Sequence, residues 1–520
     1  MKFLYRHIES LPRLAWCARM EKFSDVVEVF HGSWVETCDT FFVEGVWDGP
    51  FAQGSFGDAY LMGSGGKISD QGILFCTPYH SHERLHFFSG DSHLFVSPSL
   101  SFILHMAGQE LDIRHIPYHA QLIEMLYGYD HHVGVIPLSS GRDMKIIHFR
   151  NILVDRALNI SVVDKRSSPE FLSYEDYRQY LVDRLKLYFA NASSEHRKVR
   201  YDVISTISTG YDSPACSALA FDAGCRNAVT FKTSRAGYDR IEHGDSGKNI
   251  GEILGLSVEE YARNSYLTAE GTPEAEFVAC GDLGQDFEMC AFEKAWEQKV
   301  VILGDHGDQL WDPNRQRKHI ETKLWRYDTG GDCLVEFRTR VGFIPLRPIF
   351  VGALSHPSIH RITKSKEMIP WYLGNKYDRP IARRIIEEKG VPRELFARRK
   401  KNISILLNRD DRIQPQMKPE SFSSFLNFYL QHRQTRSAFK QKFYEVLFRA
   451  YHLCYGLISI PNKLFTRFRI PVWIPNIVPH KFSQAPGMPS FLVHWGITTI
   501  KDRYHTESQK SPLAKNARHM

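Results

Sequence analysis

The chain has 520 residues and a mass of 60.1 kDa, enough for roughly two to four domains of ordinary size. Hydrophobic residues make up 43% and charged residues 24% of the sequence, which argues against a largely disordered or fibrous protein. Because 66 basic residues are offset by 59 acidic ones, the net charge of +7 does not by itself indicate a nucleic-acid or membrane-binding protein. Nine cysteines without a CxxC pair argue against a disulfide scaffold or a zinc ribbon and favour a reducing compartment.

The sequence shows no targeting or membrane-spanning segment. The N-terminus, MKFLYRHIESLPRLAWCARMEK, lacks the apolar core of a signal peptide. The most apolar later stretch, 447–460, is too short to span a membrane and contains Arg449 and His452. We therefore expect a soluble, cytoplasmic protein with no membrane span.

Short β segments dominate the first part of the chain. Turn residues separate apolar or aromatic runs such as 72–76, 85–88 and 93–96. The sequence therefore predicts a β-rich domain over residues 1–165.

From Tyr174 the pattern changes to alternating helices and strands. The segment EDYRQYLVDRLKLYFANA has apolar residues at helical spacing. Further strands and helices are predicted at 203–207, 214–223, 227–233 and 300–303. Such alternation is typical of a parallel sheet covered by helices, so we predict an α/β domain over 166–410. Residues 411–520 are predicted to form a helical extension with a disordered polar tail.

The loop at 208–213, STGYDS, lies between a predicted strand and a predicted helix. Ser213 suits the N-cap, Pro214 the first helical turn and Gly224 the C-terminal cap. Small residues at this place let backbone N–H groups approach a phosphate at the helix N-terminus, and Asp212 adds an oxygen ligand for magnesium. An ordinary capped turn explains the loop about equally well.

A second polar loop follows the buried strand at 300–303. Gly304 is followed by Asp305 and Asp308, which would lie at the carboxyl end of a parallel strand. Open α/β sheets bind their ligands at that edge. From these residues alone, an acidic turn without a function is the alternative.

Three segments, in order, resemble the asparagine synthetase and β-lactam synthetase family. Residues 208–213 resemble the SGGxDS pyrophosphatase loop, and GDHGDQLW at 304–311, about ninety residues on, resembles GEGADELF. The segment 377–401, from YDRP to VPRELFARRKK, is similar to the C-terminal lysine region of the family. The resemblance covers residues 170–410 and implies a parallel-sheet ATP-pyrophosphatase fold of the adenine nucleotide α-hydrolase type.

The N-terminal part resembles the glutaminase domain of the same family faintly, around residues 91–112. The nucleophile of that domain is a cysteine directly after the initiator methionine, where this chain has Lys2, and the nearest cysteine is Cys17. An N-terminal nucleophile needs its thiol and a free α-amine on one residue. We therefore expect residues 1–165 to form a degenerate glutaminase-like domain that does not hydrolyse glutamine.

The resemblance implies an ATP- and Mg²⁺-dependent amide ligase. A substrate carboxylate would attack the α-phosphorus to form an acyl-adenylate, and ammonia or an amine would then release AMP. Asp212 and Asp308 match the magnesium-binding aspartates, and Lys400 matches the lysine that stabilises charge, with Lys401 or a merely solvated basic run as alternatives. The positions that match nucleotide contacts are Ser208, Gly210, Asp212, Ser213, Phe231, Lys232, Leu303 and Gly304.

The chain departs from the family at several positions. Asp305 stands where the family has a glutamate with a catalytic role, Gln309 replaces a later glutamate, and Thr209 replaces a loop glycine. These changes bear on the acyl substrate and on acid/base chemistry more than on ATP binding. Asp245 matches an acid that precedes the next helix, where capping is favoured over contact with the nucleotide.

Several alternatives stay open. Another adenylating enzyme of this loop class, such as a tRNA-modifying one, is one alternative, and a catalytically degenerate nucleotide-binding protein is another. The aromatic, basic segment 443–468 motivates a membrane-peripheral protein, and His80, His82 and His86 would form a zinc site if they shared one face of a strand near Glu83. The expected partners are a small carboxylate and ammonia or an amine rather than nucleic acid, with a homodimer left open.

Overall fold

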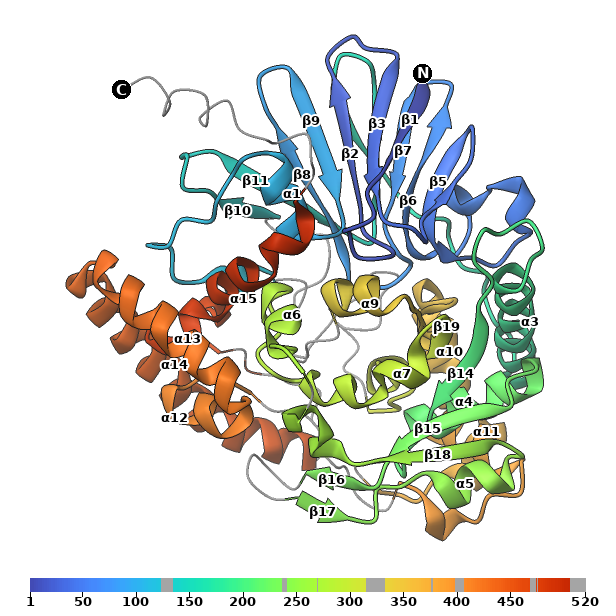
Figure 1. Cartoon of the computed structure of the whole chain (residues 1–520). Helices are drawn as coiled ribbons and strands as arrows, with labels where there is room; N and C mark the ends of the chain where they lie inside the picture. Colours follow the sequence, from blue (N-terminus) through green and yellow to red (C-terminus); the bar gives the residue numbers. More distant parts are fainter. Residues whose placement is uncertain are drawn as a thin grey trace, which may run out of the picture.

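The computed structural model describes residues 1–122, 134–235, 241–268, 270–314, 333–375, 377–397, 406–467, 474 and 476–505. Two β-sheets form the N-terminal part of the molecule, drawn at the top of Figure 1. The first has the order β1-β3-β2-β9-β8-β11-β10. Its strands are β1 (Lys2–His7), β2 (Trp16–Glu21), β3 (Val26–His31), β8 (Arg84–Ser89), β9 (His93–Ser97), β10 (Val135–Pro137) and β11 (Asp143–His148).

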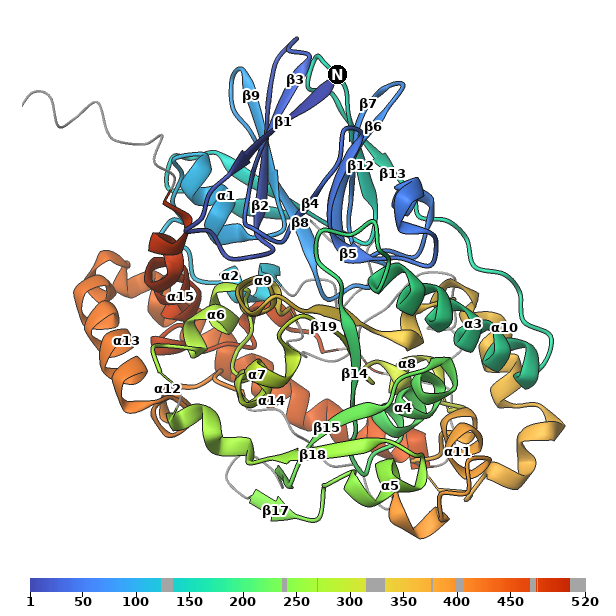
Figure 2. The ribbon, with the colours of Figure 1, turned by 45° about the vertical axis from the view of Figure 1, so that its right-hand side comes forward.

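The second sheet lies face to face with the first, as Figure 2 shows, and has the order β13-β12-β7-β6-β5-β4. Its strands are β4 (Glu36–Thr37), β5 (Phe41–Val46), β6 (Met62–Ser69), β7 (Gly72–Cys76), β12 (Asn151–Val154) and β13 (Ile160–Val163). Aromatic side chains fill the space between the sheets, with the ring of Trp16 4.9 Å from that of Phe42 and 6.3 Å from that of Phe75. The β-rich N-terminal region predicted from the sequence is confirmed.

A five-stranded, fully parallel sheet forms the centre of the second half. Its order is β18-β15-β14-β19-β20. The strands are β14 (Asp202–Thr206), β15 (Asn227–Phe231), β18 (Ser257–Tyr261), β19 (Lys299–Ile302) and β20 (Ile344–Leu346). From β14 the chain adds β15 and β18 on one side of the sheet, and it then adds β19 and β20 on the other side. The strand order therefore reverses between β14 and β19. The predicted strands at 203–207, 227–233 and 300–303 are confirmed to within two residues.

Helices cover both faces of this sheet, which explains why β19 is apolar without alternation. Val300 and Ile302 pack into one core with α3 (Tyr174–Ala192), α4 (Asp212–Ala223) and α11 (Pro380–Glu387). Val301 and Leu303 pack into a second core with α6 (Glu274–Ala279), α7 (Glu293–Trp296) and α9 (Val335–Val341). The prediction of a mixed α/β protein, with a β-rich N-terminal region followed by a helix-covered parallel sheet, is confirmed.

The helix after the first loop begins earlier than predicted. We expected Ser213 at the N-cap, but α4 begins at Asp212 and Tyr211 occupies the N-cap. The Ser213 hydroxyl instead lies 2.8 Å from the Ser208 hydroxyl across the loop, which removes it from a capping role. Gly224 ends the helix in the left-handed region at φ 117°, as predicted.

The C-terminal residues are helical, as predicted, and consist mainly of α12 (Asp410–Ile413), α13 (Pro419–His432), α14 (Ala438–Arg467) and α15 (Leu492–Ile500). The helices α13 and α15 belong to the second core, where the rings of Phe425 and Trp495 lie 5.7 Å apart. The predicted disordered tail, from residue 506 on, lies outside the described residues. Within the described ranges, no helix is both long enough and apolar enough to cross a membrane.

A buried ion cluster joins the N-terminal sheets to the second half. Arg338 of α9 contacts both carboxylate oxygens of Glu44 at 2.5 and 2.9 Å and both of Glu83 at 2.8 and 3.0 Å. All three side chains are at most 1% exposed. Burial disfavours the charged guanidinium, yet the two carboxylates hold the Arg338 pKa well above its ordinary value, while burial raises the pKa of Glu44.

We expect Arg338→Met to lower the free energy of unfolding by about 3–5 kcal/mol, because it leaves two buried carboxylates without a counter-charge. Urea unfolding followed by tryptophan fluorescence measures this. The control is Arg6→Met, whose partner Glu28 lies 3.2 Å away at an exposed site and whose loss should cost under about 1 kcal/mol. Equal effects of the two substitutions would contradict the prediction.

Candidate active site

The loops that follow β14 and β19 meet at the carboxyl edge of the parallel sheet. These strands are neighbours, with Val203 opposite Val300 and Ser205 opposite Ile302. Their crossovers leave in opposite directions, because β15 lies on one side of the pair and β20 on the other. Ligands of open α/β sheets bind in the crevice at such a reversal of strand order. The strand order therefore points to the same two loops as the sequence does, on independent grounds.

Hydrogen bonds fix the first loop, residues 208–213. The Gly210 amide donates to the Ser208 hydroxyl at 3.2 Å, and the Thr209 hydroxyl donates to Asp245 at 2.8 Å. Tyr211, at the N-cap of α4, makes no side-chain hydrogen bond to the first turn. The 12-residue helix α4 thus begins in this loop, and its N-cap side chain does not bond the backbone N–H groups of the first turn. Such N–H groups can bind a phosphate group.

Two glycines allow the second loop to lie directly against the first. A Cβ atom built on Gly304 would overlap the backbone of Ser213, and one on Gly307 would overlap the carboxylate of Asp212. The neighbour of Gly304 is main chain and cannot rotate away, so only glycine fits there. Leu303 is buried beside it and its amide donates to the Leu346 carbonyl at 2.9 Å. The predicted residues Ser213, Leu303 and Gly304 are therefore brought together.

Asp212 and Asp308, the two predicted magnesium ligands, come from the first turns of α4 and of α8 (Gly307–Leu310). Burial raises the pKa of the Tyr377 phenol, and the negative charges of Asp212 and, to a smaller extent, Asp308 raise it further. Magnesium in nucleotide sites is held by one or two carboxylates together with phosphate oxygens and water. The two aspartates fit that role, although no group of three or more potential metal ligands occurs among the described residues.

Asp305, the predicted catalytic acid, is held by an arginine and a histidine that the sequence did not connect with it. Its Oδ2 atom lies 2.8 Å from Nε of Arg347 and 2.9 Å from Nε2 of His82. Its Oδ1 atom is buried without a hydrogen-bond partner in the described part of the chain. The Asp305 side chain is 23% exposed, whereas those of Arg347 and His82 are 1% exposed. The two contacts to Oδ2 thus fix the orientation of the Asp305 carboxylate, and Oδ1 has no partner among the described residues.

The zinc-site alternative for His80, His82 and His86 is wrong, because the three histidines do not lie on one strand. Strand β8 begins at Arg84, so His80 and His82 precede it and do not share a strand face with His86. His86 accepts from Nε of Arg84 at 3.4 Å, while His80 lies 3.4 Å from Arg347. Burial and then the charge of Arg347 hold the His80 pKa well below its ordinary value, which keeps this imidazole neutral.

The third motif packs against the first loop. The Tyr211 ring lies 5.0 Å from that of Tyr377 and 6.0 Å from that of Phe396, and Arg383 of α11 donates to its hydroxyl. The Ala397 amide donates to the Thr209 carbonyl at 2.8 Å. Lys400 and Lys401 lie outside the described residues.

The remaining predicted positions lie at the end of the next strand. Phe231, the last residue of β15, stacks between Phe292 at 4.3 Å and the Arg263 guanidinium at 4.4 Å. The Lys232 amide donates to the Tyr261 carbonyl at 3.0 Å, and its side chain is exposed.

The capping role favoured for Asp245 is not observed. Helix α5 (Lys248–Ile253) has Gly247 at its N-cap, and the Lys248 amide donates to the Ser246 hydroxyl at 3.2 Å. Asp245 instead contacts Thr209 at 2.8 Å and Arg263 at 3.8 Å. It therefore fixes the first loop rather than the helix.

Sequence reasoning missed Arg347, and it considered His82 only as a zinc ligand and not as a partner of Asp305. Arg347 directly follows β20, so the rule that singled out Asp305 after β19 applies to it equally. His82 has no comparable local signal, because its partner lies far along the chain.

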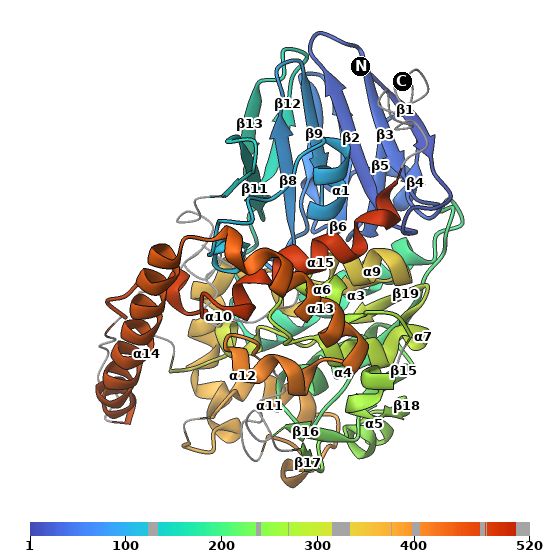
Figure 3. The same cartoon turned by 60° about the vertical axis from the view of Figure 1, so that its left-hand side comes forward.

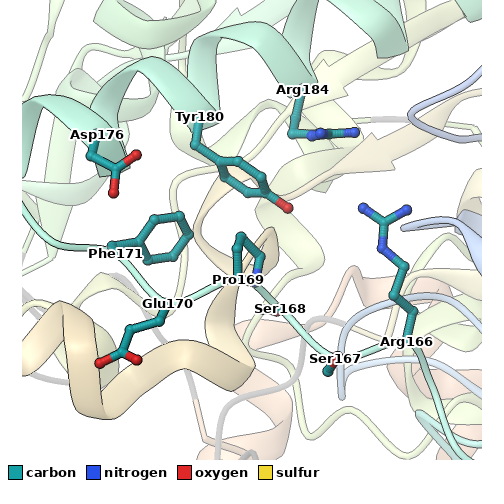
Figure 4. A pocket seen from close by; sticks show the side chains of 9 residues that line it. All are labelled: Arg166, Ser167, Ser168, Pro169, Glu170, Phe171, Asp176, Tyr180 and Arg184. Atoms are coloured by element: carbon teal, nitrogen blue, oxygen red, sulfur yellow. The ribbon is translucent and has the colours of Figure 1, made fainter.

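A cavity of about 440 Å³ lies elsewhere, between residues 166–171 and α3 (Figure 4). Arg166 and Arg184 face it from two sides, and both approach the buried carboxylate of Asp48, at 3.6 and 2.9 Å. None of the predicted site residues lines this cavity. It therefore adds nothing to the candidate active site.

No protein-family model matches the chain, and no curated protein is significantly similar to it. The case for a function therefore rests on the residues and geometry of the site itself.

We expect Gly304→Ala to destabilise the protein by about 1–3 kcal/mol, because the added methyl overlaps the main chain of Ser213. The melting temperature measures this. Gly90→Ala is the control, since the nearest atom to its Cβ is 3.5 Å away and its φ is unstrained. An unchanged melting temperature for Gly304→Ala would contradict the close approach of the loops.

Proposed function

We propose that the protein is an ATP- and magnesium-dependent ligase that adenylates a carboxylate and joins it to ammonia or an amine. One observation carries the proposal: the loops with Asp212 and Asp308 meet where the strand order of the parallel sheet reverses. The resemblance of three ordered segments to the asparagine synthetase family supports it, because all three segments lie at this edge.

The first loop would bind the pyrophosphate portion of ATP. The N-terminus of α4 attracts negative charge, and the backbone amides and side-chain hydroxyls of residues 208–213 would donate hydrogen bonds to the phosphate oxygens. Asp212 and Asp308 would hold a magnesium ion, which neutralises phosphate charge. Phe231 and Lys232, at the end of β15, would border the adenine ring.

The acyl chemistry would take place beside Asp305. An oxygen of the substrate carboxylate attacks the α-phosphorus, and the bond to pyrophosphate breaks. The amine then attacks the acyl carbon, loses a proton, and the carbon–oxygen bond to AMP breaks. Asp305, held by Arg347 and His82, has one free carboxylate oxygen with which to orient the amine or accept its proton. Lys400 would stabilise the charge that develops on the phosphate.

The N-terminal sheets would serve this reaction as a scaffold. His82 precedes β8 of those sheets and contacts Asp305 directly. The nitrogen would come from free ammonia, a substrate amine or a partner protein.

The second candidate is a protein that binds the nucleotide without ligating a substrate. The observation in its favour is the ion pair of Asp305 with Arg347, which occupies one oxygen of the acid that the family uses in catalysis. The two candidates differ in whether pyrophosphate is formed.

Pyrophosphate exchange distinguishes them. We expect radiolabelled pyrophosphate to enter ATP when magnesium and one class of carboxylic acid are present, and Asp212→Ala or Asp308→Ala to reduce the rate at least about a hundredfold. Asp202→Ala is the matched control, because Asp202 lies at the opposite end of β14 and is 83% exposed. Measurable ATP binding without exchange for any acid would favour the second candidate.

A second substitution tests the acyl site. We expect Arg347→Met to slow amide formation at least about tenfold while leaving ATP affinity within about twofold, because Asp305 loses its orientation but the phosphate loop is untouched. Product amide and AMP are measured by mass spectrometry. Arg361→Met is the control, since Arg361 pairs with Glu170 at an exposed site. A parallel loss of ATP affinity would contradict the assigned role.

A further inference from the structure

The long helix α14 carries a row of exposed apolar side chains. Residues of this row recur every three, four or seven positions, so they share one face of the helix. They are 53–82% exposed, a large fraction for phenylalanine, leucine and isoleucine. The row comprises Phe439, Phe443, Val446, Leu453, Leu457 and Ile460.

Other side chains attach α14 to the molecule, and they lie away from this row. The Tyr444 ring packs on Phe482 at 5.3 Å, and the Tyr451 carbonyl accepts from Asn476 at 3.0 Å. Asn462 exchanges hydrogen bonds of 2.9 and 2.8 Å with the backbone of Ile474. Figure 3 shows α14 standing at the margin of the molecule, apart from the helices of the second core. The apolar row therefore faces outward.

The charges beside the row are basic. Lys442 and Arg449 directly precede Phe443 and Ala450 on the helix, and Lys440 follows Phe439. Glu445 is the one acidic residue of α14, and it pairs with Arg449 at 2.9 Å. Exposed apolar side chains flanked by lysine and arginine are typical of helices that lie in the surface of an anionic membrane.

We propose that the outward face of α14 binds an anionic lipid bilayer, with the apolar row in the outer acyl region and the basic residues at the headgroups. A second copy of the chain fits less well. Two such helices would bring their basic side chains together, and the single acidic residue of α14, Glu445, is already paired with Arg449 and leaves Lys442 without a partner on the helix. Gly456 and Pro461 also lie within α14, and both residue types disfavour the regular helix that a coiled coil needs. Binding at the surface requires no span across the membrane.

Vesicle co-sedimentation of the full-length protein tests the proposal and needs no nucleotide. We expect binding to vesicles of phosphatidylcholine mixed with phosphatidylglycerol, weaker binding at high salt, and little binding to phosphatidylcholine alone. The double substitution Leu453→Glu/Leu457→Glu should lower the partition coefficient at least about tenfold. Lys442→Glu should lower it about fivefold or more for the mixed vesicles only.

Leu172→Glu is the matched control, because Leu172 is 87% exposed in the segment before α3 and should leave binding unchanged. Circular dichroism and melting temperature verify that the variants fold. Absence of binding to mixed vesicles at low salt would overturn the proposal. So would a soluble dimer that Leu453→Glu/Leu457→Glu converts to monomers without any vesicle binding, since the face would then join two copies.

Discussion

The buried contact of Arg338 with Glu44 and Glu83 is the constraint on which the arrangement of the molecule depends. Glu44 lies on β5 of the second N-terminal sheet, and Glu83 directly precedes β8 of the first. Arg338 lies on α9, between the N-terminal sheets and the parallel sheet (Figure 1). A charge this deeply buried is tolerated only with close, well-directed partners. The cluster therefore fixes the point at which α9 meets both N-terminal sheets.

This docking also completes the candidate active site. The segment that carries Glu83 carries His80 and His82, so fixing Glu83 against Arg338 brings His82 to Asp305. In that way the N-terminal part contributes a side chain to the edge of the parallel sheet. The polar groups at this edge come from strands β14, β19 and β20 and from a loop of the other half, each positioned by a rigid element.

Much of the fold followed from local patterns, and the failures have identifiable causes. Apolar runs ending in glycine and aspartate predicted β14, β19 and their loops, because strand and turn preferences are local. The order of the strands, which identifies the crevice between β14 and β19, depends on pairing between distant residues and could not be read from the sequence. Ser213 was misassigned as a cap because its hydroxyl bonds to Ser208 across the loop. The prediction that His80, His82 and His86 share one face of a strand was wrong because β8 begins only at Arg84. Contacts such as His82 with Asp305 have no local signature.

The ion cluster has a consequence for biosynthesis. Arg338 lies 294 residues after Glu44 and 255 after Glu83. At a typical 5–20 residues per second, the ribosome needs roughly 15–60 seconds to deliver the arginine once Glu44 has been made. During this interval the N-terminal sheets hold two glutamates whose only described guanidinium partner does not yet exist. Until then the two carboxylates are hydrated or protonated, so the site where α9 docks can close only after Arg338 has been made.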